Sequence, residues 1–462
     1  MAAEAGGGVE EGLACLRGER GKGFAQKDGD VAGGRGEHGA GGRRAEERGD
    51  GEGEDGPRGF YAGDMATQPK RAIVLGAGMV GSVMATDLAG DPEFEVTIAD
   101  VREDALAAAK ERAAAQGRHV AVVKADLGDA GAVTRLVGGY DMVLGALSSK
   151  IGFAALGAVI SAGKDYCDIS FMSEDFGGLD ALAKQKGVTC IVDFGVAPGM
   201  SHMLAAYGYS MLDSCESLEI YVGGLPRERR WPFEYKAAFA PSDVIEEYTR
   251  PTRLVEHGQV VVRPALSEPE LMDFAGVGTL EAFNTDGLRS LTTTLLGKVP
   301  FMKEKTLRYP GHIALMAAMR ETGLFGDAAI SVRDASGEMV QVRPLDVTSA
   351  CMFPKWSYGP GEQDLTVMRV LATGMRGGER VRHRWDLFDV FDVGTSATSM
   401  SRTTAFPCAI MARMVARKQF VSPGVNAPEM AGLAQELPAM ILAELEKRGV
   451  RYTYEVKAAG GK

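Results

Sequence analysis

The feature that most constrains this chain is a glycine-rich turn between an apolar run and a helical pattern. The run at 71–75 (RAIVL) has the character of a buried parallel strand, and a helix is expected at 79–89. Gly76, Gly78 and Gly81 follow the run in G-x-G-x-x-G spacing. In this arrangement, backbone amides and the positive end of the helix converge on a pyrophosphate. The sequence therefore predicts a dinucleotide-binding turn.

Each glycine has a task in such a turn: the first allows a tight bend, the second lets a phosphate approach, and the third lets the helix pack on the strand. A second strand at 95–99 delivers Asp100, 19 residues after Gly81, where a ribose 2′-hydroxyl needs an acceptor. The Asp100 carboxylate repels a 2′-phosphate, whereas Arg102 offers a contact to a phosphate or to the adenine. We therefore predict NAD as the cofactor, with NADP less favoured. The alternative is a glycine turn that serves packing alone.

Other cofactor contacts are expected where the first helix begins and where strands end. A dinucleotide on a parallel sheet lies beyond the carboxyl ends of the strands. The expected contacts of this kind are Met79, Val80, Asp126, Ala146 and Leu147.

Strands and helices alternate from residue 71 to about 200. Their spacing is typical of βαβ units and predicts a parallel sheet with right-handed crossovers. The strands are expected at 71–75, 95–99, 119–124, 141–145, 165–169 and 188–193, and the helices at 79–89, 102–115, 129–137, 152–162 and 174–186.

Composition and pattern divide the chain into four parts. Residues 1–64 hold 20 glycines and few aliphatic side chains, so they cannot bury enough apolar surface to offset ordering, and we predict a disordered tail. Residues 65–200 form the predicted Rossmann domain and 201–395 an α+β substrate and oligomerisation domain. Residues 396–462 are expected to be helical and to pack back on the first domain. The predicted fold class is thus α/β: a doubly wound Rossmann domain with a second α+β domain inserted before a helical return segment.

The second domain shows alternating runs of apolar and polar residues. QVVVRP, ISVRDASGEMVQVRP and DLTVMRVLATG predict a mostly antiparallel sheet. In the second run, the turn DASGE separates two stretches that suit half-buried strands, which predicts a hairpin. A helix is expected at 202–212, and a loop rich in aromatic, charged and proline residues at 225–241.

Charge and cysteine content exclude several classes of function. The formal net charge of -11 leaves no basic excess to neutralise a phosphate backbone, so we expect no nucleic-acid partner. The six cysteines include no C-x-x-C pair, so neither a zinc site nor a disulfide framework is indicated and no metal is predicted. No apolar run approaches the roughly 20 residues that span a bilayer. We therefore expect a cytoplasmic protein that acts on a small molecule and has no membrane partner.

Seven ordered stretches, which together cover residues 71–453, resemble the saccharopine dehydrogenase family and more closely its lysine 6-dehydrogenase branch. They are GAGMVG, GKDYCDIS, DFGVAPGMSHMLA, GGLPRERRWPFEYKAAF with EEYTRP, GTLEAFNTDGL, EKTLRYPGH and TSMSRTTAFP. The resemblance implies a nicotinamide-dependent dehydrogenase that acts on a carbon bearing an amino group. It also implies an inserted substrate domain and a homo-oligomer, such as a dimer.

The leading expectation is NAD-dependent oxidation of the ε-amine of L-lysine. The alternatives are a saccharopine dehydrogenase or another carboxyalkyl-amine reductase, and, from a different class, a Rossmann module that senses NAD without turnover. Lysine needs a compact pocket with one carboxylate clamp, whereas saccharopine needs sites for three carboxylates and hence more arginines or lysines. Either reaction requires a neutral amine and a donor carbon about 3 to 3.5 Å from the nicotinamide ring.

Asp168 and His312 are the candidate catalytic residues. Asp168 ends a predicted strand at the edge where ligands collect, so it could accept the amine proton or instead cap the following turn. His312, in RYPGH, has the side chain with the intrinsic pKa nearest neutrality, although a lone histidine often serves structure. Asp193 and His202 lie near the same edge, where loop bracing and packing are the expected roles.

Substrate contacts are expected from three stretches. Arg308 could clamp a carboxylate in a bidentate manner, or form a solvated salt bridge. The stretch EAFNTDG offers an apolar wall with acceptors for a cationic amine, or an Asx-type turn closed by Gly287. The loop containing WPFEYK either caps the active site or covers the sheet. The substrate-binding candidates are Tyr235, Glu281, Phe283, Asn284, Thr285, Asp286 and Arg308.

Overall fold

The computed structural model describes residues 68–460 except 238, 360 and 435. The tail predicted for residues 1–64 lies outside this range. Among the described residues, no helix combines the length and the apolar character that a membrane crossing requires.

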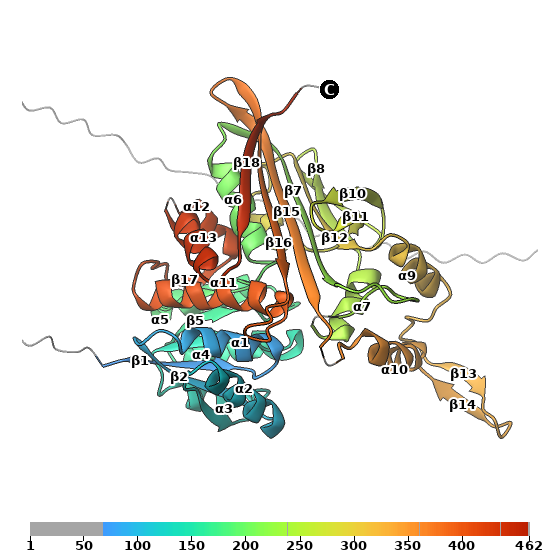
Figure 1. The fold of residues 1–462 in the computed structure, drawn as a ribbon, viewed down its shortest axis with the longest axis horizontal. Coiled ribbons are helices and arrows are strands. Elements are labelled where there is room, and N and C mark those ends of the chain that lie inside the picture. Colours follow the sequence, from blue (N-terminus) through green and yellow to red (C-terminus); the bar gives the residue numbers. More distant parts are fainter. Residues whose placement is uncertain (1–67, 238, 360, 435, 461–462) are drawn as a thin grey trace, which may run out of the picture. The chain divides into compact units, whose positions relative to one another are not determined.

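A seven-stranded parallel sheet forms the first domain (Figure 1). The strand order is β17-β6-β5-β4-β1-β2-β3. Both faces of the sheet are buried because alternate residues of a strand face opposite sides: in β1, Ala72 belongs to one core cluster and Ile73 to the other. The predicted doubly wound arrangement is thus confirmed. The strands are β1 (Lys70–Leu75), β2 (Phe94–Asp100), β3 (Ala121–Lys124), β4 (Met142–Gly145), β5 (Asp165–Asp168), β6 (Thr189–Ile191) and β17 (Gly424–Asn426).

Helices connect these strands, as the βαβ spacing predicts. The stretch predicted as one helix at 174–186 is instead a 3-10 turn, η1 (Phe176–Leu179), followed by α5 (Asp180–Lys186). Two glycines in the first half explain the difference, because glycine is a poor helix former. The other helices of this domain are α1 (Met79–Leu88), α2 (Glu103–Ala115), α3 (Ala130–Val137), α4 (Ser149–Ser161) and α6 (Met200–Ser210).

The second domain contains a nine-stranded, mostly antiparallel sheet, as predicted. Its long central strands β7, β15 and β16 run side by side (Figure 1), and only the β7 and β12 pair is parallel. The strands are β7 (Ser214–Pro226), β8 (Thr252–Glu256), β9 (Gln259–Arg263), β10 (Glu270–Phe274), β11 (Gly278–Asn284), β12 (Phe301–Arg308), β15 (Asp364–Arg376), β16 (Glu379–Val390) and β18 (Tyr452–Ala458). The helices are α7 (Pro241–Thr249), α8 (Leu291–Thr294), α9 (His312–Glu321) and α10 (Pro344–Trp356).

The predicted hairpin forms from β13 (Ile330–Arg333) and β14 (Met339–Val342) around the turn DASGE. It does not join the large sheet but makes a two-stranded sheet of its own. Most of its residues are exposed, so the prediction of half-buried strands is wrong. The alternating pattern reports strand geometry, whereas burial depends on a covering layer that the tertiary structure does not supply here.

The C-terminal segment returns to the first domain through α11 (Ser399–Ala416), α12 (Pro428–Leu433) and α13 (Leu437–Lys447). Helix α11 packs on α1, β4 and β5, and the buried Arg413 pairs with Asp87 at 2.6 Å. Two strands interrupt the expected helical segment: β17 extends the first sheet, and β18 extends the second beside β16. Each is short or polar at an edge, so pattern alone did not reveal it.

Candidate active site

The glycine turn has the geometry that a dinucleotide requires. Gly76 has φ +100°, and a Cβ there would lie 2.3 Å from the Ala146 carbonyl oxygen. A Cβ at Gly81 would lie 2.0 Å from the Gly76 oxygen, so helix and strand pack in close contact. Gly78, by contrast, faces open space: nothing lies within 4 Å of its added Cβ. The backbone at the N-terminus of α1 is therefore open to a phosphate, and the residues present fit a dinucleotide.

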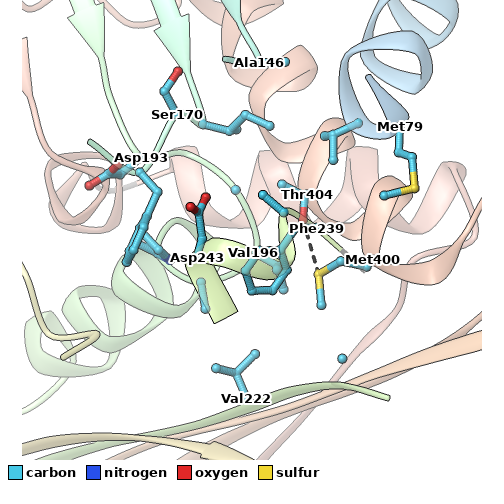
Figure 2. Close-up of a pocket in the computed structure, with 18 of the residues that line it drawn as sticks. Met79, Ala146, Ser170, Asp193, Val196, Val222, Phe239, Asp243, Met400 and Thr404 are labelled. Atoms are coloured by element: carbon cyan, nitrogen blue, oxygen red, sulfur yellow. Dashed lines mark hydrogen bonds between the residues drawn. The ribbon is translucent and has the colours of Figure 1, made fainter. Parts of the chain in front are cut away.

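A cavity of about 410 Å³ runs from this turn to the second domain. Its wall includes residues of the glycine turn, the segments after β4, β5 and β6, and residues of β7, β12, α7 and α11. Figure 2 shows Met79 and Ala146 on the nucleotide side, facing Val222 and Asp243 of the second domain across the cavity. A single cavity thus joins the expected nucleotide site to side chains of the inserted domain.

Six of the predicted cofactor residues line this cavity, and four do not. Asp100 accepts hydrogen bonds from the amides of Ala77, at 2.7 Å, and Arg102, at 2.9 Å, so its carboxylate reaches back to the glycine turn. The exposed Arg102 side chain pairs with Asp104. Asp126 accepts from the Gly128 amide at 2.9 Å. Gly76 belongs to the turn but does not line the cavity. The residues on the wall are Gly78, Met79, Val80, Gly81, Ala146 and Leu147.

Asp168 does not reach the cavity wall. It is fully buried and accepts hydrogen bonds from the Tyr166 hydroxyl, at 2.9 Å, and from the amide and hydroxyl of Ser170. Burial raises the pKa of Asp168 to about 6, while the Ser170 hydrogen bonds oppose the rise. Ser170 itself lines the cavity. The structure therefore places Asp168 behind Ser170 as a support, and not where a substrate proton could reach it directly.

His312 is also withdrawn from the cavity. Its Nδ1 lies 2.8 Å from the Phe233 carbonyl oxygen and its Nε2 lies 2.9 Å from the Tyr248 hydroxyl. Because a carbonyl only accepts, Nδ1 donates, and the neutral ring accepts from Tyr248 through Nε2. Burial, followed by the nearby Arg308, lowers the pKa of His312 to about 3. With both ring nitrogens occupied, His312 has the structural role that the sequence left open.

Arg308 and Tyr235 do line the cavity, as predicted for substrate contacts. The Arg308 guanidinium lies 4.4 Å from the centre of the Tyr235 ring, and pairs with Glu247 at 2.7 Å. Its other partners are the Tyr248 hydroxyl and its own strand at Leu307. These contacts use three of the five guanidinium N–H groups, so one N–H on each terminal nitrogen has no hydrogen-bond partner among the described residues.

The stretch EAFNTDG does not contact the cavity, which corrects the prediction of a substrate wall there. Its side chains are committed to neighbouring strands and turns, because β11 lies beyond β12 from the cavity. Glu281 accepts from the Gly311 amide, Phe283 is buried in a core cluster, Asn284 donates to Ser267, Thr285 bonds Thr306, and Asp286 pairs with Arg253.

Sequence reasoning missed two acidic residues on α7, Asp243 and Glu247. They stand four residues apart, hence on one helix face, and both line the cavity. Burial raises the pKa of both carboxyl groups, and for Glu247 the ion pair with Arg308 opposes that rise. The signal was available: proline followed by serine and aspartate in PSDVIEEY is typical of a helix start.

Two family models match the chain. The saccharopine dehydrogenase NADP binding domain matches residues 72–191, and the saccharopine dehydrogenase C-terminal domain matches 195–450, which is more than half of the chain. The chain belongs to the saccharopine dehydrogenase family. The resemblance of the seven sequence stretches to this family is thereby confirmed, whereas its lysine 6-dehydrogenase branch stays a prediction, and the assignment of the opening turn to a pyridine nucleotide gains support.

Relatives with curated names share about a fifth of their residues with this chain. The mitochondrial alpha-aminoadipic semialdehyde synthase of Bos taurus is 23% identical over 451 residues, which cover 83% of this chain and 47% of the relative. The chain thus spans about half the length of the mammalian relatives it matches. The saccharopine dehydrogenase [NADP(+), L-glutamate-forming] of Schizosaccharomyces pombe is 20% identical over 454 residues, 83% of this chain and 98% of the relative.

A solved structure shows the same fold. The apo saccharopine dehydrogenase (L-Glu forming) of Saccharomyces cerevisiae superposes with a TM-score of 0.70 at 18% sequence identity, covering 84% of this chain and 100% of that protein. The predicted fold class is confirmed.

Proposed function

We propose that this protein is a pyridine-nucleotide-dependent dehydrogenase that oxidises an amine-bearing carbon of an amino acid, with the ε-amine of L-lysine as the leading substrate. The relatives named above support an oxidoreductase of this family. The observation that carries the choice of substrate is the charge of the cavity wall. Among the described residues that line it, Arg308 is the one basic side chain, against the acids Asp193, Asp243 and Glu247.

Two of these three acids form ion pairs, and the third does not. Asp193 pairs with Arg289 and Glu247 pairs with Arg308, whereas Asp243 makes no ion pair with another described residue. Of the three acids that line the cavity, Asp243 is thus the one without an ion-pair partner among the described residues, although Lys150 and Arg250 lie close enough to lower its pKa. Lysine, with two ammonium groups and one carboxylate, is a net cation at neutral pH, while saccharopine has three carboxylates and is a net anion. Charge complementarity favours lysine.

The side chains of the cavity can hold both ends of such a substrate. The two remaining N–H groups of Arg308 can donate to the single carboxylate. Asp243 is then the side chain that can hold the distal ammonium and act as its proton acceptor, and burial, which raises the pKa of this carboxyl group, makes it a stronger base. Figure 2 shows the Asp243 carboxylate directed toward the cavity. Oxidation requires the neutral amine, which is the form that such a proton transfer would supply.

When bound, the nicotinamide ring accepts the hydride that leaves the amine-bearing carbon. The substrate amine becomes an imine, and water converts the imine to an aldehyde with release of ammonia. Val196, Val222 and Phe239 contribute apolar surface to the wall of the cavity. Apolar walls limit access of water before the hydride has moved.

For the cofactor, we propose NAD. Two backbone amides hold Asp100 at the end of β2, where its negative charge repels a 2′-phosphate. NADP is the alternative, since the matched family domain and the Schizosaccharomyces pombe relative carry NADP in their names. Titration of the purified chain with NADH and NADPH decides between them: tighter binding of NADPH would overturn the proposal for NAD.

A substrate screen tests the proposal. The purified chain is mixed with NAD or NADP and with lysine, ornithine, saccharopine or a short diamine, while reduced cofactor is followed by absorbance. We expect turnover with lysine, and Asp243→Asn should lower kcat/KM for lysine about 100-fold or more, in the range that removal of a positioned proton acceptor costs. Turnover with saccharopine and none with lysine would favour the saccharopine alternative. Nucleotide binding without any turnover would favour an NAD sensor.

A further inference from the structure

The segment between β11 and β12 attaches the second domain to the first. We call residues 287–294 the docking segment. Its Leu288 carbonyl oxygen lies 3.1 Å from Nε2 of His202 on α6. Its Ser290 and Thr294 hydroxyls donate to the two carboxylate oxygens of the buried Glu429 on α12, at 2.9 Å and 2.6 Å. These bonds anchor the docking segment to the first domain.

Arg289 stands in the middle of this segment and makes a different kind of contact. Its Nε donates to Asp193 at 2.7 Å, and its Nη2 donates to the Met172 carbonyl oxygen at 2.6 Å. The guanidinium also lies 4.4 Å from the centre of the Phe171 ring. Phe171 and Asp193 line the cavity. Unlike the partners of Leu288, Ser290 and Thr294, two partners of Arg289 thus belong to the cavity wall.

The backbone at these contacts is held in an uncommon conformation. Phe171, Asp193 and Arg289 have φ values of 47°, 56° and 40°, all in the left-handed region that side chains other than glycine rarely adopt. Three such residues touch one another. Strained residues of this kind persist where their surroundings over-determine them, and they gather at functional sites. Because the Arg289 side chain is only 9% exposed and that of Asp193 1% exposed, their ion pair is well shielded from water.

The two turns that Arg289 holds occupy a particular part of the sheet. Phe171 follows β5, and Asp193 follows β6. Asp100 at the end of β2 marks the adenosine half of the nucleotide site, so the nicotinamide half lies beyond β4, β5 and β6. Arg289 therefore braces the turns around the reacting half of the cofactor and does not touch the adenosine half.

We propose that Arg289 is a positioning residue: from the second domain, it fixes the turns after β5 and β6 and so shapes the part of the cavity that receives the nicotinamide ring. The inference rests on the pyridine-nucleotide site of the proposed function, but not on the identity of the amine.

The binding of two nucleotides, ADP-ribose and NADH, distinguishes this positioning role from a general contribution to stability. ADP-ribose has the adenosine, the pyrophosphate and the second ribose but lacks the nicotinamide ring, which NADH carries. In Arg289→Met, we expect the Kd for ADP-ribose to stay within about twofold, while the Kd for NADH rises about tenfold, as loss of one charge-assisted network would cause. Arg289→Lys keeps the charge but not the planar fork, so it should restore only part of the NADH affinity.

A matched control variant removes contacts of the docking segment that do not reach the cavity. The double variant Ser290→Ala/Thr294→Val leaves Glu429 without both hydroxyl donors and should lower Tm at least as much as Arg289→Met. We expect its ratio of the two Kd values to equal that of the wild type. If the control shifts the ratio as much as Arg289→Met does, or if Arg289→Met leaves the ratio unchanged, Arg289 only docks the domains and the proposal is overturned.

The binding assay also separates this inference from the proposed substrate. A changed ratio in Arg289→Met, together with a wild type that oxidises none of the amines in the screen, would support the positioning role and reject the lysine reaction. If Arg289→Met does not fold, the comparison is made with Arg289→Lys against the same double variant, and an unchanged ratio in Arg289→Lys would then refute the proposal.

Discussion

Replacement of Gly78 by valine separates nucleotide binding from folding. Gly78 precedes α1 with φ -68° and ψ -172°, an extended conformation that any residue adopts. Nothing lies within 4 Å of a Cβ at this position, yet the residue lines the cavity. A valine side chain would therefore fill the space through which a phosphate approaches the backbone, while its Cβ would meet no atom of the protein.

The expected magnitudes follow from these contacts. Replacing a glycine that needs no special φ stabilises the folded state by about 0.4 to 1 kcal/mol, because the unfolded chain loses conformational freedom. Loss of glycine from a helix N-cap destabilises the folded state by a similar amount, so the two effects largely cancel. The free energy of unfolding should thus change by less than about 1 kcal/mol. Loss of one charge-assisted hydrogen bond to a phosphate costs about 1.5 to 3 kcal/mol, so the Kd for NADH should rise about 10- to 150-fold.

The assay pairs a fluorescence titration of NADH with thermal unfolding, and two variants serve as controls. Gly178→Val adds a side chain in open space on the exposed 3-10 turn of the same domain, and should change neither quantity. Gly81→Ala places a Cβ 2.0 Å from the Gly76 oxygen, and should lower Tm as well as affinity, since overpacking costs about 1 to 3 kcal/mol. An unaltered Kd in Gly78→Val would refute the assignment of the opening turn.

Three further predictions concern buried groups around the cavity. Burial, followed by the charge of Glu247, raises the pKa of Glu304 to about 8, so the folded state binds this proton more tightly than the unfolded chain and the free energy of unfolding falls as pH rises from about 4.5 to about 8. Glu304→Gln should flatten that slope in urea titrations at several pH values, and a slope equal to that of the wild type would contradict the assignment. Arg308→Lys retains the charge without the planar fork, and should raise the KM for lysine about 10-fold or more in initial-rate assays; an unchanged KM would remove Arg308 as the carboxylate clamp. His312→Phe should lower the free energy of unfolding by about 1 to 3 kcal/mol, because it leaves Tyr248 and a backbone carbonyl unpaired. The pH dependence of kcat should stay as in the wild type. If the fall of kcat at low pH disappears in this variant, His312 takes part in the proton transfer after all.

Local sequence predicted the first domain well because its signals are local. The glycine spacing, the apolar runs and the helix patterns each arise within a few residues, and β1 to β6 formed close to their expected positions. The hairpin at DASGE also formed for a local reason, but its exposure did not follow from its pattern. Strands β17 and β18 could not be predicted in the same way, because each is stabilised by a distant strand to which it pairs.

The same distinction between local and distant contacts applies to the candidate site. Gly78 and Arg308 are on the cavity wall as expected from motif and chemistry, whereas Asp168 and His312 are buried behind it with their polar atoms occupied. A titratable residue at the end of a strand or beside a turn has the same local sequence whether it faces a ligand or a hydroxyl of its own protein. Which of these partners it has depends on the side chain that packs opposite.

The residues alone determined that this chain has a nucleotide-binding turn, a parallel sheet around it and membership of a dehydrogenase family, because a short backbone motif must be built from particular residues wherever it occurs. Only the tertiary structure placed Asp243 and Glu247 of α7 on the wall of the cavity that begins at that turn, and only it set Arg289 against Phe171 and Asp193. Those contacts join residues that lie far apart along the chain, so their energies depend on packing between domains, which no local pattern records.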